Sequence, residues 1–187
     1  MIEVSHVSAG YGGQDVLKDL SFSLPQGENL AILGPNGCGK TTLLRVMAGL
    51  LRCRGDVRVD GRSIARMKPR ELAAHIGLMS QNMQIPFDYT VEDVVRMGRY
   101  RMRRRGLFEA ENREDGQAVR DALETVGLWE LRNRTANTLS GGQQQRVFLA
   151  RVFAQQPEIV MLDEPTNHLD LSSQIELMQQ LRLYGSQ

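Results

Sequence analysis

Eight consecutive residues carry the clearest chemical signal in the sequence. Residues 34–41 read Gly-Pro-Asn-Gly-Cys-Gly-Lys-Thr, which matches the G-x-x-x-x-G-K-[ST] pattern of a phosphate-binding loop. The glycines let the backbone turn tightly and bring its N–H groups close to an anion. Lys40 can reach a β- or γ-phosphate, and the Thr41 hydroxyl can hold Mg²⁺. An ordinary glycine-rich turn is the alternative, but four fixed positions match by chance in only about one chain in a hundred of this length. We therefore predict nucleotide binding.

The residues on either side of this loop predict a strand before it and a helix after it. Leu30 to Leu33 form an unbroken apolar run, which is typical of a buried parallel strand. After the loop, apolar residues recur at helical spacing at positions 43, 44, 47, 48 and 51. A helix that begins at Thr41 points the positive end of its dipole at the loop. This context favours a phosphate site over a chance match.

A second group of residues lies near the other end of the chain, where an apolar run ends in two acids. Ile159 to Leu162 predict a buried strand, which Asp163 and Glu164 follow. Ligands bind outside the carboxyl ends of such strands, so Asp163 could hold Mg²⁺ through water, opposite Thr41. Glu164 could polarise a water for attack on a γ-phosphate. A strand that ends in surface acids would be the better interpretation if the phosphate-binding loop were absent.

The third group is Leu-Ser-Gly-Gly-Gln at 139–143, at the start of a predicted helix with an apolar face. Exposed N–H groups, the positive end of the helix dipole and the hydroxyl of Ser140 together make a second anion site. One nucleotide needs only one phosphate cradle. The second cradle therefore suggests that it serves the nucleotide of another molecule.

Bulk properties limit the class of protein. The chain has 187 residues, enough for one domain or one domain plus a lobe, and a formal net charge of +1, which implies no bulk attraction to nucleic acid or anionic lipid. Cys38 and Cys53 are too few for a disulfide framework, and a cysteine in the phosphate-binding loop suggests a reducing compartment. The sequence has no apolar run as long as a membrane span and no signal-peptide layout. We expect a cytosolic protein whose membrane role comes through a partner.

The remaining patterns predict the arrangement of the chain. Strands are expected within 2–22, at 57–59 and at 76–80, with a short helix at 68–74. Strand signals disappear from 91 to 154, where helical patterns surround a basic run at 99–105. We interpret that run as a solvated helix end; the alternative is a contact with a partner or with lipid head groups. A last helix contains Ile175, Met178 and Leu181. We predict an α/β core (1–81 and 156–187) with an antiparallel β flank, and a helical lobe at 82–155.

In this order, the three motifs resemble the ATP-binding subunit of ABC transporters, over essentially the whole chain. The resemblance implies one ABC ATPase domain of the P-loop NTPase type at 1–187, with an inserted helical subdomain. It implies ATP and Mg²⁺ as cofactors and ATP hydrolysis coupled to transport. It also implies a homodimer, transmembrane permease subunits as partners, a solute-binding protein as an indirect partner, no nucleic acid, and a place on the cytoplasmic face of the cell membrane.

The resemblance also assigns roles to single residues. Tyr11 is expected to stack on adenine, although it could be a packing residue at a strand edge. Gln81 is expected to join the lobes, touch Mg²⁺ and the attacking water and sense the permease, although it could be a polar strand end. The implied sites are catalytic Glu164, Lys40 and Gln81; nucleotide-binding Tyr11, Gly34, Pro35, Asn36, Gly37, Cys38, Gly39, Lys40, Thr41 and Thr42; Ser140, Gly141, Gly142 and Gln143 for the partner's nucleotide; a dimer loop of Asn167, His168, Leu169 and Asp170; and metal ligands Thr41, Gln81 and Asp163.

Residues 81–87, 90–99 and 164–170 are similar to ATPases of importers for ferric siderophores, haem and cobalamin. The alternatives are a soluble ABC ATPase that acts on ribosomes or DNA, and a nucleotide-binding remnant with little hydrolysis. In the family a further strand and a catalytic histidine follow the last helix, and this chain stops before them; His6, His75 and His168 are in the wrong places to substitute. We therefore expect a truncated form, without its C-terminal core strand, that binds ATP weakly and hydrolyses it poorly.

Overall fold

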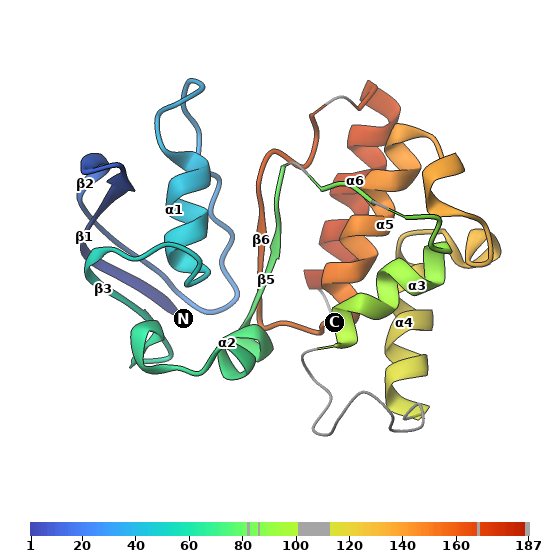
Figure 1. Cartoon of the computed structure of the whole chain (residues 1–187), viewed down its shortest axis with the longest axis horizontal. Coiled ribbons are helices and arrows are strands. Elements are labelled where there is room, and N and C mark those ends of the chain that lie inside the picture. The colour runs from blue at the N-terminus through green and yellow to red at the C-terminus, as the bar shows by residue number, and fades with distance from the viewer. Residues whose placement is uncertain (82, 86, 101–112, 168, 186–187) are drawn as a thin grey trace.

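The computed structural model describes residues 1–81, 83–85, 87–100, 113–167 and 169–185 (Figure 1). The strands are β1 (Ile2–Tyr11), β2 (Gln14–Leu24), β3 (Arg54–Val59), β4 (Arg62–Ser63), β5 (Ile76–Met79) and β6 (Ile159–Leu162). The α-helices are α1 (Lys40–Met47), α2 (Pro69–His75), α3 (Val91–Arg96), α4 (Arg113–Thr125), α5 (Gly141–Ala154) and α6 (Leu171–Gly185). Short 3₁₀ helices lie at Ile64–Arg66, Met97–Arg99, Trp129–Leu131 and Ala136–Thr138. No helix in these ranges is both long and apolar enough to cross a membrane.

An antiparallel sheet forms the N-terminal part of the molecule, as predicted. Its strand order is β2-β1-β3-β4, and β1 pairs with both β2 and β3. Gly12 and Gly13 form the turn between β1 and β2, and both have positive φ angles (59° and 84°), as the tight turns of β-hairpins require. The sequence predicted several short strands within 2–22, whereas the structure has two strands of 10 and 11 residues.

Helix α1 packs against this sheet and closes the first of two hydrophobic clusters. Val46 and Met47 of the helix are buried together with Val4 and Val59 of the sheet. The helix predicted after the phosphate-binding loop is therefore confirmed, and its buried side fixes the loop at its N-terminal end. Burial of apolar side chains of this size stabilises a fold by about 1.5–3 kcal/mol each.

A parallel pair of strands, β5 and β6, lies between the antiparallel sheet with α1 and the helices α3 to α6 (Figure 1). Their register pairs Ile76 with Ile159 and Met79 with Leu162, across about 80 residues of sequence. Ile76 belongs to the first cluster and Met79 to the second, so this small sheet contributes to both. The pair also brings the two segments that follow the strands, at 80–81 and 163–164, to the same end.

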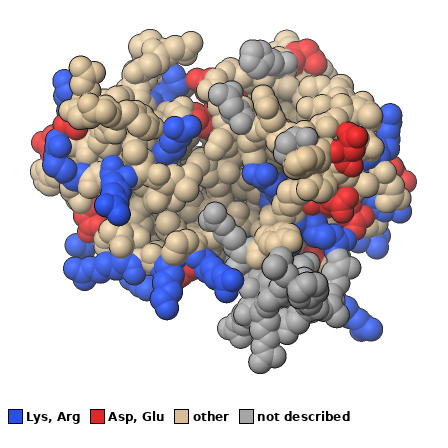
Figure 2. Space-filling model, viewed as in Figure 1, with Lys and Arg blue, Asp and Glu red and all other residues tan. Residues whose placement is uncertain are grey.

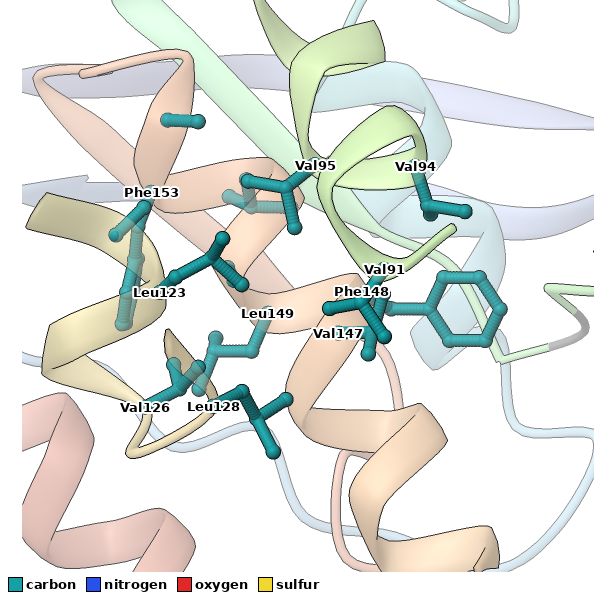
Figure 3. Packing of buried hydrophobic residues seen from close by; sticks show 14 of the residues in the cluster. Val91, Val94, Val95, Leu123, Val126, Leu128, Val147, Phe148, Leu149 and Phe153 are labelled. Atoms are coloured by element: carbon teal, nitrogen blue, oxygen red, sulfur yellow. The ribbon is translucent and has the colours of Figure 1, made fainter. Parts of the chain in front are cut away.

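Helices α3, α4, α5 and α6 form the second cluster, which confirms the helical texture predicted after residue 91. Figure 3 shows apolar side chains from α3, α4 and α5 pointing toward one another, among them Val91, Leu123 and Leu149. Leu177 of α6 is buried in the same cluster, and the ring of Tyr184 stacks on Phe153 with centroids 3.9 Å apart.

Two predictions about particular segments are wrong. Residues 30–33 form no strand, and Leu33 is 90% exposed; a buried parallel strand needs hydrogen-bonded neighbours and cover on both faces, and no described strand pairs with this run. Arg99, at the start of the basic run, is not a solvated helix end but is 8% exposed and paired with Asp115. Residues 101–105 of that run, and Asn82 and Pro86 of the importer-like segment, lie outside the described residues.

Candidate nucleotide-binding site

The phosphate-binding loop leads directly into α1, whose first residue is Lys40. Gly37 and Gly39 have φ angles of 82° and 104°, in the left-handed region where a side chain would be strained. A Cβ on Gly39 would also lie 3.0 Å from side-chain carbons of Val16 and Leu17 in β2. The loop can therefore lie this close to the hairpin only because Gly39 lacks a side chain.

The ammonium group of Lys40 lies among the oxygens of the loop and of the acid that follows β6. Its Nζ donates hydrogen bonds to the carbonyl oxygens of Gly34 (2.9 Å) and Pro35 (3.1 Å). The same Nζ lies 3.8 Å from Oε1 of Glu164. Lysine is thus already directed at the inside of the loop, where a phosphate oxygen would replace the carbonyls as its partner.

Thr41 and Asp163, which are 122 residues apart in the sequence, meet beside the loop. The Thr41 hydroxyl donates a hydrogen bond of 3.1 Å to Oδ1 of Asp163. Asp163 directly follows β6 and is buried, with 4% of its surface exposed. The Asp163 N–H donates to the carbonyl of Met79 in β5 (2.9 Å). A hydroxyl and a carboxylate at this separation are the oxygen donors that Mg²⁺ prefers, so the donor set fits that ion.

Glu164 is held by residues from separate segments. Gln81 Nε2 donates a hydrogen bond of 2.5 Å to Oε2 of Glu164, and Asn167 Nδ2 donates to the same oxygen. Oε1 of Glu164 faces Lys40. The backbone of Glu164 has a φ angle of 51°, which is uncommon for a residue other than glycine and costs of order 1–3 kcal/mol. The structure therefore brings together Lys40, Gln81 and Glu164, the three residues that the resemblance names as catalytic.

Tyr11 lies at the end of β1, with 48% of its surface exposed. Its hydroxyl accepts a hydrogen bond of 3.2 Å from Nη1 of Arg45 in α1. Sequence reasoning missed Arg45, because the contact depends on how the hairpin folds over the helix. A cation in the last turn of the predicted helix was the one available signal.

Ser140 caps α5, and its cap leaves most of the helix N-terminus open. Ser140 Oγ accepts from the N–H of Gln143 (3.3 Å), and Gln143 Oε1 accepts from the N–H of Ser140 (3.1 Å). Gly142 approaches α6 closely, since a Cβ there would lie 3.1 Å from Ser173 Oγ. Among the described residues, no hydrogen bond or ion pair joins 140–143 to the phosphate-binding loop.

The segment predicted to cross a dimer axis has local roles in this chain. Asn167 contacts Glu164, and Leu169 packs against the helical cluster. Asp170 accepts hydrogen bonds from the N–H and hydroxyl of Ser173 (both 3.0 Å) at the start of α6, and these bonds hold the pKa of Asp170 below its ordinary value. His168 lies outside the described residues.

The other two histidines pair with acids outside this site. His6 Nδ1 lies 2.8 Å from Asp19, and His75 Nδ1 lies 2.7 Å from Glu158. Neither contacts a residue of the phosphate-binding loop, in agreement with their positions in the sequence.

Comparisons with known proteins identify the family of the chain. The profile of the ABC transporter family matches residues 17–167. The chain is 43% identical to the ferric enterobactin transport ATP-binding protein FepC of Escherichia coli, over 94% of this chain and 64% of that protein. It is 41% identical to the hemin import ATP-binding protein HmuV of Bradyrhizobium diazoefficiens, over 97% of this chain and 68% of that protein.

A solved structure gives the same result for the fold. The structure of cbiO1 from Clostridium perfringens, part of the ABC transporter complex cbiONQ, has a TM-score of 0.84 and 29% identity, over 99% of this chain and 73% of that one. The chain thus spans about two thirds of the length of FepC and of HmuV. These matches confirm the resemblance and the α/β P-loop fold inferred from the motifs. The chain belongs to the ABC transporter family.

Proposed function

We propose that this chain binds and hydrolyses ATP to power an ABC importer, with ferric siderophores, haem or cobalamin-type complexes as the transported solutes. One observation carries the catalytic part of the proposal: three separate segments meet at one loop, and they bring Lys40, Thr41, Gln81, Asp163 and Glu164 together. FepC and HmuV, which are named for ferric enterobactin and hemin, support the choice of solute.

Each residue at the loop has a role that its contacts allow. The loop N–H groups and Lys40 would bind the β- and γ-phosphates, after Lys40 exchanges its two carbonyl partners for phosphate oxygens. Thr41 and Asp163, with Gln81 beyond them, would hold Mg²⁺. The bound ion supplies positive charge that offsets the charge on the phosphates.

Glu164 is proposed to orient and deprotonate the attacking water. Its Oε2 is fixed by Gln81 and Asn167, while Oε1 faces Lys40, so the carboxylate has a defined orientation before any nucleotide arrives. A base held in this way contributes through its position as much as through its basicity. Asn167 acts through Glu164 and is therefore a positioning residue.

The open N-terminus of α5 is proposed to complete the site of a second copy. The cap uses the Ser140 hydroxyl and one N–H group, so the remaining N–H groups of the first turn are available to an anion. A homodimer arranged head to tail would place each cap over the other's γ-phosphate. Permease subunits would bind this dimer at the cytoplasmic face of the membrane, and a solute-binding protein would act through them.

Two alternatives are less favoured. A soluble ABC ATPase that acts on ribosomes or DNA has no support from the relatives above, which are named as transport and import proteins. A remnant with little hydrolysis is favoured by one feature, the apolar run at 30–33 beside the loop, in which Leu30 is 48% and Leu33 90% exposed. An assay of ATP turnover in the presence of Mg²⁺ separates this remnant from an active ATPase.

The chain offers a matched test of nucleotide binding, because Lys18 is exposed on β2 and Lys40 lies in the loop. Lys40→Ala should weaken ATP binding by about tenfold or more, since a charge-assisted contact with phosphate is worth about 1.5–3 kcal/mol. Lys18→Ala should bind as the parent does. Calorimetric titration with Mg²⁺ and ATP measures both, and equal affinities of the two variants would refute the assignment of the loop.

A further inference from the structure

Gln145, in the second turn of α5, contacts the turn that contains Glu164. Its Nε2 donates a hydrogen bond of 2.9 Å to the carbonyl oxygen of Pro165, and its side chain is half-buried. Pro165 directly follows Glu164, whose own carbonyl accepts from the N–H of Asn167 (3.2 Å). The bond of Gln145 therefore reaches the catalytic turn from the helical half of the molecule.

Hydrogen bonds hold the strained residue Glu164 on both sides. Before it, the N–H of Asp163 donates to the carbonyl of Met79 in β5 (2.9 Å). After it, the carbonyl of Pro165 accepts from Gln145. Between these two bonds Glu164 keeps a φ angle of 51°, and such a backbone persists only where the surrounding structure enforces it. The orientation of Glu164 thus depends on α5 as well as on the sheet.

Helix α5 is also fixed to the core at its other end. Gln155, which caps its C-terminus, donates through Nε2 to the carbonyl oxygens of Ala73 and Ile76 (2.8 Å to Ile76). Figure 2 shows that the surface is hollowed between the two halves of the molecule, so on this face the halves do not meet at the surface. Two glutamine amides therefore join the same helix to the core, and of these Gln145 is the one beside Glu164.

The same helix begins at the open N-terminus that is proposed to serve a second copy. Ser140 and Gln145 are five residues apart, and all of α5 is continuous over 14 residues, or about 21 Å. A shift of the capped end therefore also shifts the amide that holds Pro165. One short stretch of helix thus lies between the proposed contact with a second copy's nucleotide and the residue next to Glu164.

We propose that Gln145 is a positioning residue for hydrolysis. Its hydrogen bond to Pro165 keeps the Glu164 carboxylate in the orientation that catalysis needs, and it makes that orientation depend on the position of α5. This inference rests on the proposed function, which makes Glu164 the base and the start of α5 the contact with a second copy. Gln145 itself touches neither nucleotide nor water.

The test compares Gln145→Met with two matched controls, Gln144→Met and Gln155→Met. Gln144 donates to the carbonyls of Asn137 (3.4 Å) and Leu139 (3.2 Å), just before the helix cap. In steady-state assays with Mg²⁺ and ATP, kcat should fall about tenfold for Gln145→Met, while the Kd for ATP from calorimetry changes less than about twofold. The kcat of each control should stay within about threefold of the parent, although each loses bonds of the same kind.

A second measurement asks whether Gln145 acts through Glu164. In single-turnover assays of the Glu164→Gln variant, adding Gln145→Met should lower the residual hydrolysis less than about twofold, because the base that Gln145 positions is already absent. Gln145→Glu keeps the shape of the side chain but cannot donate from a carboxylate, so it should lose as much kcat as Gln145→Met. It decides the test if Gln145→Met does not fold.

The outcomes separate the inference from the function beneath it. If the parent chain does not hydrolyse ATP, the proposed function and this inference both fall. If the parent is active and the Gln145 variants are equally active, the inference alone is overturned. An equal loss of kcat in Gln144→Met or Gln155→Met would assign the effect to the cap or the anchoring of α5. A matching rise in Kd, or a further tenfold loss in the Glu164→Gln background, would also overturn the positioning role.

Discussion

Removing the guanidinium of Arg45 should weaken ATP binding, although Arg45 is not part of the phosphate-binding loop. Its only predicted effect is on Tyr11, whose hydroxyl accepts a hydrogen bond of 3.2 Å from Arg45 Nη1. Tyr11 lies just before a turn of two glycines, and nearly half of its surface is exposed, so few contacts fix its ring. We propose that Tyr11 stacks on the adenine base; Arg45 would then reduce the entropy that the ring loses on stacking.

The size of the effect follows from the exposure of the contact. A hydrogen bond between exposed groups contributes about 0.5–1 kcal/mol, so Arg45→Met should raise the Kd for ATP about two- to fivefold. Tyr11→Phe keeps the ring and removes the acceptor, so its effect should be of the same size. Tyr11→Ala removes the stacking surface, which is worth about 1–3 kcal/mol per base, and should raise Kd about 5- to 150-fold.

A double-mutant cycle tests whether the two residues act through one contact. Calorimetric titration with Mg²⁺ and ATP gives the Kd of each single variant and of Arg45→Met with Tyr11→Phe. If they share one contact, the double variant should be no weaker than the weaker single variant. Arg52→Met, at an exposed arginine just beyond α1, is the control and should bind as the parent does. Effects that simply multiply in the double variant would refute the positioning role of Arg45.

Three further predictions concern reactivity, stability and pH. Maleimide should label the exposed Cys38 thiol and ATP should protect it, while Cys53 reacts slowly at pH 8 because burial raises the pKa of its thiol; equal labelling of Cys38 with and without ATP would contradict this. Asp115→Ala should lower the free energy of unfolding by about 3–5 kcal/mol in urea titrations, because it removes the carboxylate that pairs with the buried Arg99, and Asp115→Ala combined with Arg99→Met should recover most of that loss. Asp170→Ala should lower the melting temperature near pH 7 and have little effect near pH 2. Hydrogen bonds depress the pKa of this carboxyl in the folded state, so its contribution to stability is present above the unfolded-state pKa and is lost as the pH falls through the folded-state pKa. An effect on the melting temperature that does not change with pH would show that the charge is not involved.

Spacing in the sequence predicted the contacts that depend on strand ends. Thr41 and Asp163 were expected to lie opposite each other because Thr41 ends a phosphate-binding loop and Asp163 follows a buried strand, and the structure places Thr41 Oγ1 3.1 Å from Asp163 Oδ1. Gln81 lies close to Glu164 because β5 and β6 are parallel neighbours that end together, although the sequence pointed to Gln81 only through the resemblance. Motifs of this kind can be recognised in a sequence because the chemistry fixes the residue types.

Other features depend on the packing of segments that carry no motif. The apolar run at 30–33 has the composition of a buried strand, but composition does not say whether a neighbouring strand is present. Arg99 looked like part of a solvated charge run, because its partner Asp115 lies on another helix. The contact between Arg45 and Tyr11 depends on how one hairpin lies over one helix. None of these can be inferred from local residue patterns.

The left-handed backbone of Glu164 implies a trade-off at the heart of the molecule. Glycine would adopt a φ angle of 51° without steric penalty, yet an acid occupies the position. If the carboxylate is needed for hydrolysis, the chain retains backbone strain at position 164 in order to keep it. Glu164→Gly would then relieve the backbone strain and abolish hydrolysis. Selection for thermal stability alone would therefore favour loss of the function.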